Sequence, residues 1–141
     1  GHAVEAIMSP NMMHGECVAV GCVVEAELSR RMGNAATLDA DKVDRVTRCF
    51  QSYGLPVHVP AGLDLDVAMG KMSMDKKNQG STIRMTIVTD IGTSLSNPRP
   101  VDGALVREAM AESGEAGAKL PAWKPHAGSH GQAAAGGQMA A

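Results

Sequence analysis

Two histidines near the start of the chain are the residues best suited to chemistry. His14 is followed by Gly15 and stands where a helical pattern begins. A neutral imidazole there can bind a metal ion through one ring nitrogen while a hydrogen bond orients the other nitrogen. An isolated histidine at a helix start is more often structural, so the spacing alone favours a capping role for His14 over a metal ligand.

His2 precedes His14 by twelve residues. This is not the spacing of a one-helix zinc motif, in which both histidines lie on the same face of one helix. If the two histidines share a site, the segment between them must fold back. Glu5 and Glu16 lie close enough in sequence to be ligands or orienting carboxylates, although acidic side chains are more often solvated or cap a helix.

A compact lysine cluster is the second feature with chemical meaning. It consists of Lys71, Lys76 and Lys77, and the last two directly follow Asp75 in a polar turn. A lysine there can serve as a point charge for a phosphate or a carboxylate. Taken alone, the turn is better interpreted as solvated. The sequence contains neither a glycine-rich phosphate loop nor a recognisable Ser-His-Asp arrangement.

The cysteines are three, Cys17, Cys22 and Cys49, and none forms a CxxC pair. An odd count with this spacing argues against a disulfide framework, so we expect buried, reduced thiols. A structural zinc finger is excluded because Cys17 and Cys22 lack a second close pair of ligands.

Composition limits the class of protein. The 141 residues suit about one domain, and 44% hydrophobic against 20% charged residues allow a folded core. The net charge of −2 argues against a nucleic-acid partner. The longest apolar stretch, residues 17–24, is far shorter than the ~20 residues that cross a bilayer. No basic leader precedes an apolar segment, so we expect a cytoplasmic protein without a membrane partner.

These side chains must be positioned by helices. The apolar spacing predicts helices over residues 14–32, from Asp39 or Asp41 to about residue 53, over 63–72 and over 101–110, after a short apolar stretch at 4–8. Residues 83–88 read as one strand, followed by a turn at 91–93. One strand cannot form a sheet, so it either pairs outside the chain or forms a small local ribbon.

The character of the sequence changes after Ala111. Residues 112–141 are rich in Ala and Gly and carry few branched side chains. Such a segment buries too little apolar surface to offset its ordering entropy, so we expect it to be disordered. The sequence therefore predicts a mainly α-helical domain over residues 1–111 with one short strand or ribbon, and a disordered tail over 112–141.

Three segments together resemble the 3-dehydroquinate synthase family. They are Gly1-His2-Ala3-Val4-Glu5-Ala6, Met13-His14-Gly15-Glu16-Cys17-Val18-Ala19-Val20-Gly21 and Met74-Asp75-Lys76-Lys77-Asn78. Tyr53-Gly54-Leu55-Pro56 and Ile91-Gly92-Thr93 fit as well. The resemblance covers roughly residues 1–110 and is greatest to the synthase portion of the fungal pentafunctional shikimate-pathway polypeptide.

The resemblance implies the helical, metal-binding C-terminal domain of a synthase. That family converts 3-deoxy-arabino-heptulosonate 7-phosphate into 3-dehydroquinate and phosphate, in the shikimate pathway of aromatic amino acid biosynthesis. It uses zinc or another divalent metal, together with NAD. By resemblance, His14 is a metal ligand, His2 is a catalytic residue that contacts substrate, and Lys76 binds the anionic substrate. No residue of this chain is matched to cofactor binding.

The resemblance also implies that much of the enzyme lies outside this sequence. The NAD-binding N-terminal domain and the other zinc ligands are not matched, and the full-length family member is a homodimer. We therefore expect a fragment that is inactive by itself and poorly soluble, because the face that meets the other domain is exposed. Two alternatives stay open. One is another sugar-phosphate cyclase or an iron-type alcohol or glycerol dehydrogenase of the same fold. The other is a non-catalytic truncated helical module, held by a partner through a Met-rich face.

Overall fold

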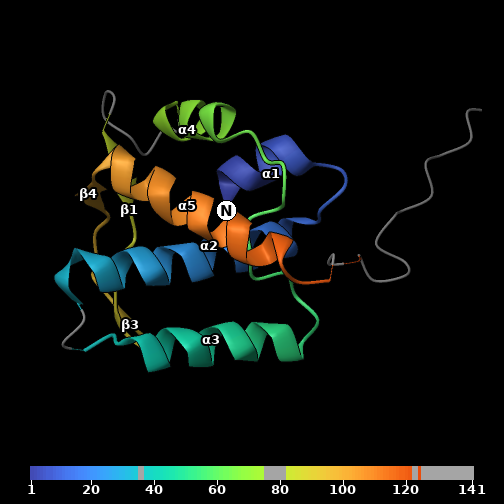
Figure 1. The fold of residues 1–141 in the computed structure, drawn as a ribbon. Coiled ribbons are helices and arrows are strands. Elements are labelled where there is room, and N and C mark those ends of the chain that lie inside the picture. Colours follow the sequence, from blue (N-terminus) through green and yellow to red (C-terminus); the bar gives the residue numbers. More distant parts are fainter. Residues whose placement is uncertain (35–36, 75–81, 122–123, 125–141) are drawn as a thin grey trace, which may run out of the picture.

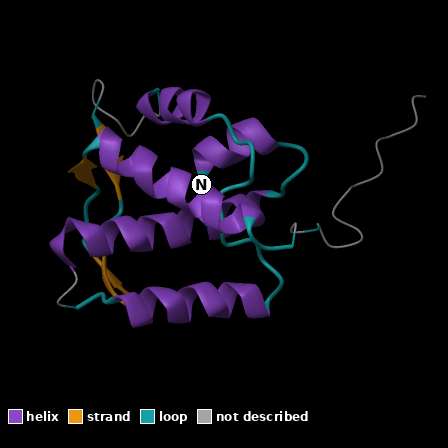
Figure 2. Ribbon diagram, viewed as in Figure 1, coloured by secondary structure: helices purple, strands orange, loops and turns teal. Residues whose placement is uncertain are grey.

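Five α-helices and four short strands form the part of the chain that the computed structural model describes, residues 1–34, 37–74, 82–121 and 124. Helices dominate (Figure 2), which confirms the mainly α-helical class. The helices are α1 (His2–Met8), α2 (His14–Ser29), α3 (Ala40–Ser52), α4 (Leu65–Ser73) and α5 (Gly103–Ala118). A π-helical turn, η1 (Arg30–Asn34), extends α2. None of the helices in these described ranges is long and apolar enough to cross a membrane.

Helix α2 is the centre of the arrangement. It contacts α1, α3 and α5, and α4 packs against α1 and α5. In Figure 1, α3 lies below α2, α5 passes in front of it, and α1 and α4 lie above. The first half of α2 is almost entirely apolar, which is why it can be surrounded on several sides. The sequence predicts burial all round for this half, but Val18 is 39% exposed.

Acidic side chains begin three of the helices. Asp39 accepts a hydrogen bond from the amide of Lys42, and Asp64 and Asp102 do the same for the first turns of α4 and α5. An aspartate at this position satisfies amides that have no partner within the helix. Of the two predicted caps for α3, Asp39 and Asp41, Asp39 is the one that begins the helix. Gly33 adopts φ 92° where α2 and its extension end, as predicted for a residue that stops a helix.

The strands form two local ribbons. Strand β1 (Ile83–Met85) pairs antiparallel with β4 (Arg99–Val101), and β2 (Val88–Asp90) pairs with β3 (Thr93–Ser94). The strand predicted over residues 83–88 is therefore broken in two, and its local-ribbon alternative is the correct one. Each half finds a nearby partner, because chain reversals within residues 85–101 bring the later strands back alongside the earlier ones.

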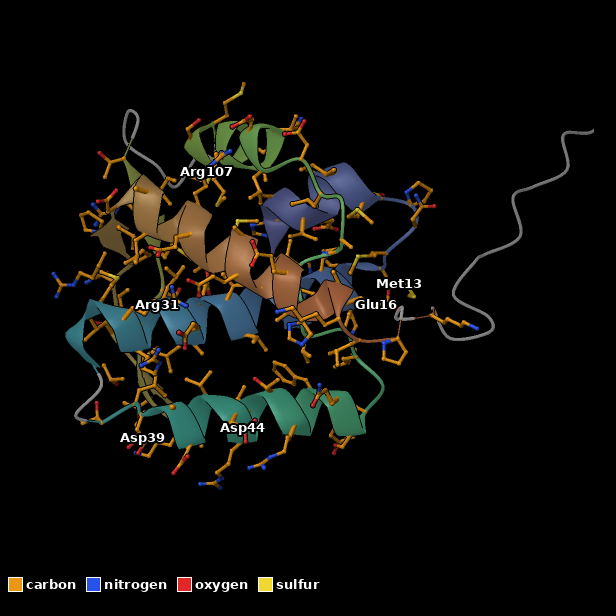
Figure 3. All side chains as sticks on the ribbon, viewed as in Figure 1. Met13, Glu16, Arg31, Asp39, Asp44 and Arg107 are labelled. Carbon is orange, nitrogen blue, oxygen red and sulfur yellow. The ribbon has the colours of Figure 1, made fainter. Side chains whose placement is uncertain are left out.

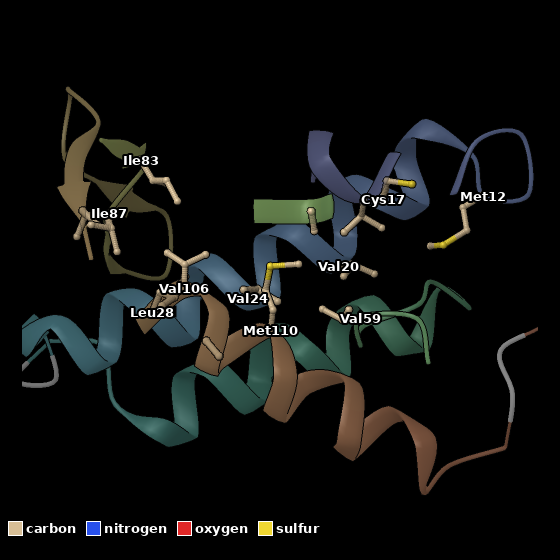
Figure 4. Close-up of a cluster of buried hydrophobic side chains, with 14 residues drawn as sticks. Met12, Cys17, Val20, Val24, Leu28, Val59, Ile83, Ile87, Val106 and Met110 are labelled. Atoms are coloured by element: carbon tan, nitrogen blue, oxygen red, sulfur yellow. The ribbon is translucent and has the colours of Figure 1, made fainter. Parts of the chain in front are cut away.

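One main core fills the space between the helices and the first ribbon (Figure 4). It gathers aliphatic and sulfur side chains from α1, α2, α4, α5 and β1, including Val20, Val24, Leu28, Ile83, Val106 and Met110. A smaller cluster of Ala26, Leu38 and Val43 lies between α2 and α3, with Val88 packed against it. The sequence predicts an apolar stripe of Val43, Val46, Phe50 and Tyr53 along α3; Val43 is buried, whereas Tyr53, just beyond the helix, is 74% exposed.

The last helix differs most from expectation. The sequence predicts a helix over 101–110 and a disordered tail from 112, whereas α5 begins at Gly103 and continues to Ala118. Val101 belongs to β4 instead. The helix persists past Met110 because Glu112 pairs with Arg31 of η1, and Ser113 accepts a hydrogen bond from the amide of Val59 at 3.0 Å. The remaining predicted tail, apart from residues 119–121 and 124, lies outside the described residues.

Candidate functional site

The two histidines singled out by the sequence lie next to each other. His2 is the first residue of α1 and His14 is the first residue of α2. Their ring centroids are 6.5 Å apart, and the rings are stacked at 28°. The segment between the helices therefore folds back, as required if both imidazoles are to serve one site.

Glu5 orients the imidazole of His14. Its Oε2 lies 3.0 Å from Nδ1 of His14, and the two side chains are 34% and 65% exposed, respectively. A carboxylate only accepts hydrogen bonds, so this contact places a hydrogen on Nδ1. In the neutral imidazole, the lone pair is then on Nε2. Histidines that bind metals are commonly held in this way by a carboxylate on the second ring nitrogen.

Glu16 has a structural role at the same helix start. Its Oε2 accepts a hydrogen bond from the amide of Met13 at 2.7 Å, and the residue is only 5% exposed. Figure 3 shows Met13 and Glu16 together at the beginning of α2. The first turn of the helix is fixed by this contact, and with it the backbone of His14. Of the two glutamates near the histidines, Glu5 faces the imidazole and Glu16 caps the helix.

The described residues provide one oriented imidazole and no complete set of metal ligands. In the ranges that the structure describes, no group of three or more His, Cys, Asp or Glu side chains could hold a metal ion. Cys17 is fully buried and packs in the main core, where burial and the nearby Glu5 carboxylate raise the pKa of its thiol. Catalytic zinc takes about three protein ligands, so the chemistry of His14 fits zinc as one ligand among several.

A cavity of about 440 Å³ lies beside His2. Among the described residues, four ionisable side chains line it: His2, Glu25, Lys71 and Arg84. The other described residues of the lining come from the start of α1, the end of α4, strand β1 and the loops beside β1 and β4; they are Gly1, Ala3, Ala6, Met72, Met74, Ile83, Met85, Thr86 and Pro98.

Lys76 lies outside the described residues, together with the rest of the 75–81 turn. Met74 and Ile83, which are close to the two ends of that turn, both line the cavity beside His2.

Arg84 is a residue that the sequence interpretation does not single out. The sequence offers one sign of its importance: Arg84 is a cation that stands between two apolar residues, Ile83 and Met85, in a short strand. Lys71 is recognised only as part of the lysine cluster, without a role of its own. His58 lines a separate, mostly apolar groove of about 630 Å³ that includes Met12, Val57 and Leu120 and neither of the two paired histidines.

The sequence model of the family described as "3-dehydroquinate synthase C-terminal" matches residues 1–78. The chain belongs to this family. The matched residues contain both histidines of the site, the Glu5 that contacts His14 and the 75–78 part of the lysine turn. They also contain α1 to α4 in full.

Among characterised proteins, this family member is similar to fungal pentafunctional AROM polypeptides. It is 43% identical over 102 residues to that of Komagataella phaffii, 42% over 104 residues to that of Candida tropicalis and 44% over 102 residues to that of Kluyveromyces lactis. Each match covers 65% of this chain and 6% of the polypeptide. The chain thus spans about 6% of the length of these curated relatives.

Proposed function

We propose that this chain supplies the metal-binding and substrate-binding histidines of a 3-dehydroquinate synthase. The reaction converts 3-deoxy-arabino-heptulosonate 7-phosphate into 3-dehydroquinate and phosphate in the shikimate pathway. The observation that carries the proposal is the arrangement of His14, with Glu5 3.0 Å from its Nδ1 and the ring of His2 stacked beside it. Family membership supports the same assignment, because the matched residues contain all three.

His14 is proposed as a zinc ligand through Nε2, with Glu5 fixing the ring. When bound, zinc polarises the substrate oxygen that is oxidised and orients the substrate as a Lewis acid. The remaining ligands come from residues outside the described ranges. NAD is proposed to bind mainly to a separate nicotinamide-binding domain, since no residue here is assigned to it.

His2 is proposed to contact substrate and to handle a proton. It lines the cavity of about 440 Å³, so its ring borders a space large enough for a small polar ligand. A neutral imidazole can both accept and donate a proton near neutral pH. Lys76 is proposed to bind the anionic end of the substrate, since Met74 and Ile83, near the two ends of its turn, line this same cavity.

The isolated chain is proposed to be inactive, because a single oriented imidazole does not hold catalytic zinc. In the complete enzyme, a nicotinamide-binding domain and a second subunit would be its partners. The purified 141-residue chain should therefore give no detectable 3-dehydroquinate from the sugar phosphate with added zinc and NAD. Product formation by the chain alone would overturn this part of the proposal, as would tight zinc binding by calorimetry.

A graft into a relative tests the assignment of residues. The part of this chain that aligns with the Komagataella phaffii polypeptide, 65% of its residues, would replace the matching segment there, and 3-dehydroquinate formation and phosphate release would be measured. We expect an active graft in which His14→Ala lowers kcat/KM by roughly 100-fold or more, because a catalytic metal ligand is lost. Arg48→Gln, on the exposed face of α3, is the matched control and should leave the rate unchanged. A folded but inactive graft, or full activity of His14→Ala, would refute the proposal.

A further inference from the structure

The cavity beside His2 has two cations on its wall. Lys71 comes from the last turn of α4, and Arg84 comes from the middle of β1. Both line the same space of about 440 Å³ as His2 does. The cations thus reach the cavity from a helix and a strand that lie on either side of the 75–81 turn, and His2 reaches it from α1.

Arg84 is held in place by the first ribbon. Its Nη2 donates a hydrogen bond to the carbonyl oxygen of Pro98 at 2.8 Å. Its backbone lies opposite Pro100 in the β1–β4 pair. A guanidinium carries five N–H donors in a rigid plane, so it can contact a backbone carbonyl and further acceptors at the same time. This geometry suits two-pronged contact with a phosphate or a carboxylate.

The rest of the wall favours an anion of limited size. Among the described residues of the lining, Glu25 is the one carboxylate, against the side chains of two cations. Ile83 and Met85 flank Arg84 with apolar surface, and Ile83 is only 6% exposed. A concave space with an excess of one sign of charge and low-dielectric walls concentrates ligands of the opposite sign.

We infer that Arg84 and Lys71 are specificity-determining residues that hold an anionic group, a phosphate or a carboxylate, of a small ligand whose remainder lies against His2. The inference rests on the proposed function for the role of His2. It extends that function to two residues to which the family resemblance assigns no role. The anion contacts Arg84 through the guanidinium plane and Lys71 through its ammonium group.

Anion titrations of the 141-residue chain test the inference. Inorganic phosphate and acetate would be added separately at constant ionic strength, and backbone amide shifts would be followed by NMR. We expect saturable shifts at cavity residues such as Ala3, Met72 and Met85. A larger affinity for phosphate identifies a phosphate group as the natural anion, and a larger affinity for acetate identifies a carboxylate. Either result supports an anion site.

Variants separate the site from general charge. Arg84→Gln and Lys71→Gln should each weaken binding roughly tenfold, which corresponds to about 1.4 kcal/mol. Arg99→Gln is the matched control, since it removes the same charge from neighbouring β4 and its side chain does not line the cavity. It should change the affinity less than twofold. Arg84→Gln also removes the contact with Pro98 and could fail to fold for that reason. In that case Lys71→Gln tests the inference, because Lys71 is exposed.

Three results would overturn the inference. They are the absence of saturable shifts, shifts spread evenly over basic residues, and a loss for Arg99→Gln as large as for Lys71→Gln. Each concerns anion binding by the chain itself. An inactive graft would instead remove the proposed reaction and leave these titrations unaffected, so the two failures are distinguishable.

Discussion

Oε2 of Glu5 lies 3.0 Å from Nδ1 of His14, across the gap between α1 and α2. The two residues are nine positions apart in sequence and begin to act together only because the helices pack against each other. This contact, more than the histidine alone, supports the proposed metal-ligand role of His14 over a helix cap.

The contact predicts the tautomer of His14. We expect neutral His14 to carry its hydrogen on Nδ1, as seen by long-range ¹H–¹⁵N NMR of the imidazole nitrogens. Glu5→Gln should shift the population toward the Nε2–H form, because the amide can also donate and no longer favours Nδ1–H. His58 lines the separate apolar groove, away from the paired histidines, so it serves as an internal control and should not change. A predominant Nε2–H form in the unmodified chain would contradict the assigned geometry.

Ser29 connects the central helix to the second ribbon, and its loss should be costly. The side chain is fully buried, donates to the carbonyl of Glu25 at 2.7 Å and accepts from the amide of Val88 at 2.9 Å. Ser29→Ala removes the partner of that half-buried amide and leaves a void at a fully buried position, so we expect a loss of about 1–3 kcal/mol in the free energy of unfolding. Urea denaturation measures it.

Ser52→Ala is the control for this substitution. Its hydroxyl donates to the carbonyl of Cys49 on an exposed part of α3, so the change should stay within about 0.5 kcal/mol. Equal effects of the two serine variants would mean that the contact between Ser29 and Val88 adds no stability.

Much of the helical framework follows from the sequence, because caps and apolar spacing act locally. Asp39, Gly33 and the stretch from His14 onward predict their elements correctly. The extension of α5 does not follow, since it depends on Glu112 reaching Arg31, a residue 81 positions away. Similarly, His14 and His2 can be identified from the sequence, but their proximity cannot. The two rings are close only because α1 packs against α2.

Stability should fall in acid through Glu27. Its carboxylate accepts hydrogen bonds from Arg30 and Arg31 at 2.7–2.8 Å, and the contact with Arg30 is the main cause that lowers its pKa below the usual 4.5. A lowered folded-state pKa stabilises the protein above the unfolded value, and that contribution is lost as the pH falls through the folded value. Figure 3 shows Arg31 between α2 and α5, where the network joins them.

The variant Glu27→Gln isolates this effect. At pH 7 it should lower the free energy of unfolding by about 1 kcal/mol, given the partial exposure of the pair. The difference from the unmodified chain should shrink steadily below pH 4.5, when measured by urea denaturation at several pH values. A difference that stays constant down to strongly acidic pH would exclude the ion pairs as its source.

Gly21 should tolerate no side chain. A Cβ built there would lie 2.5 Å from the backbone nitrogen of Gly1 and 2.7 Å from its Cα, which is closer than van der Waals contact allows. Gly21→Ala should therefore destabilise the chain by about 1–3 kcal/mol and change the ring-proton shifts of His2 and His14. Gly70→Ala, in α4 with nothing within 4 Å of the added carbon, should instead stabilise by about 0.5–1 kcal/mol. Thermal melts of both variants compare them directly.

The close approach at Gly21 also sets a rule for sequence variation. Gly21 does not contact the histidine proposed as a metal ligand. Because it has no side chain, however, the start of α1 can approach α2 closely at this position. His2 directly follows Gly1, the residue that approaches Gly21, so the distance between the rings of His2 and His14 depends on the size of residue 21. In descendants of this sequence, substitutions at position 21 should appear only together with compensating changes at positions 1 and 2. The absence of a side chain at position 21 thereby helps to set the spacing of the two imidazoles, although Gly21 lies beside neither ring.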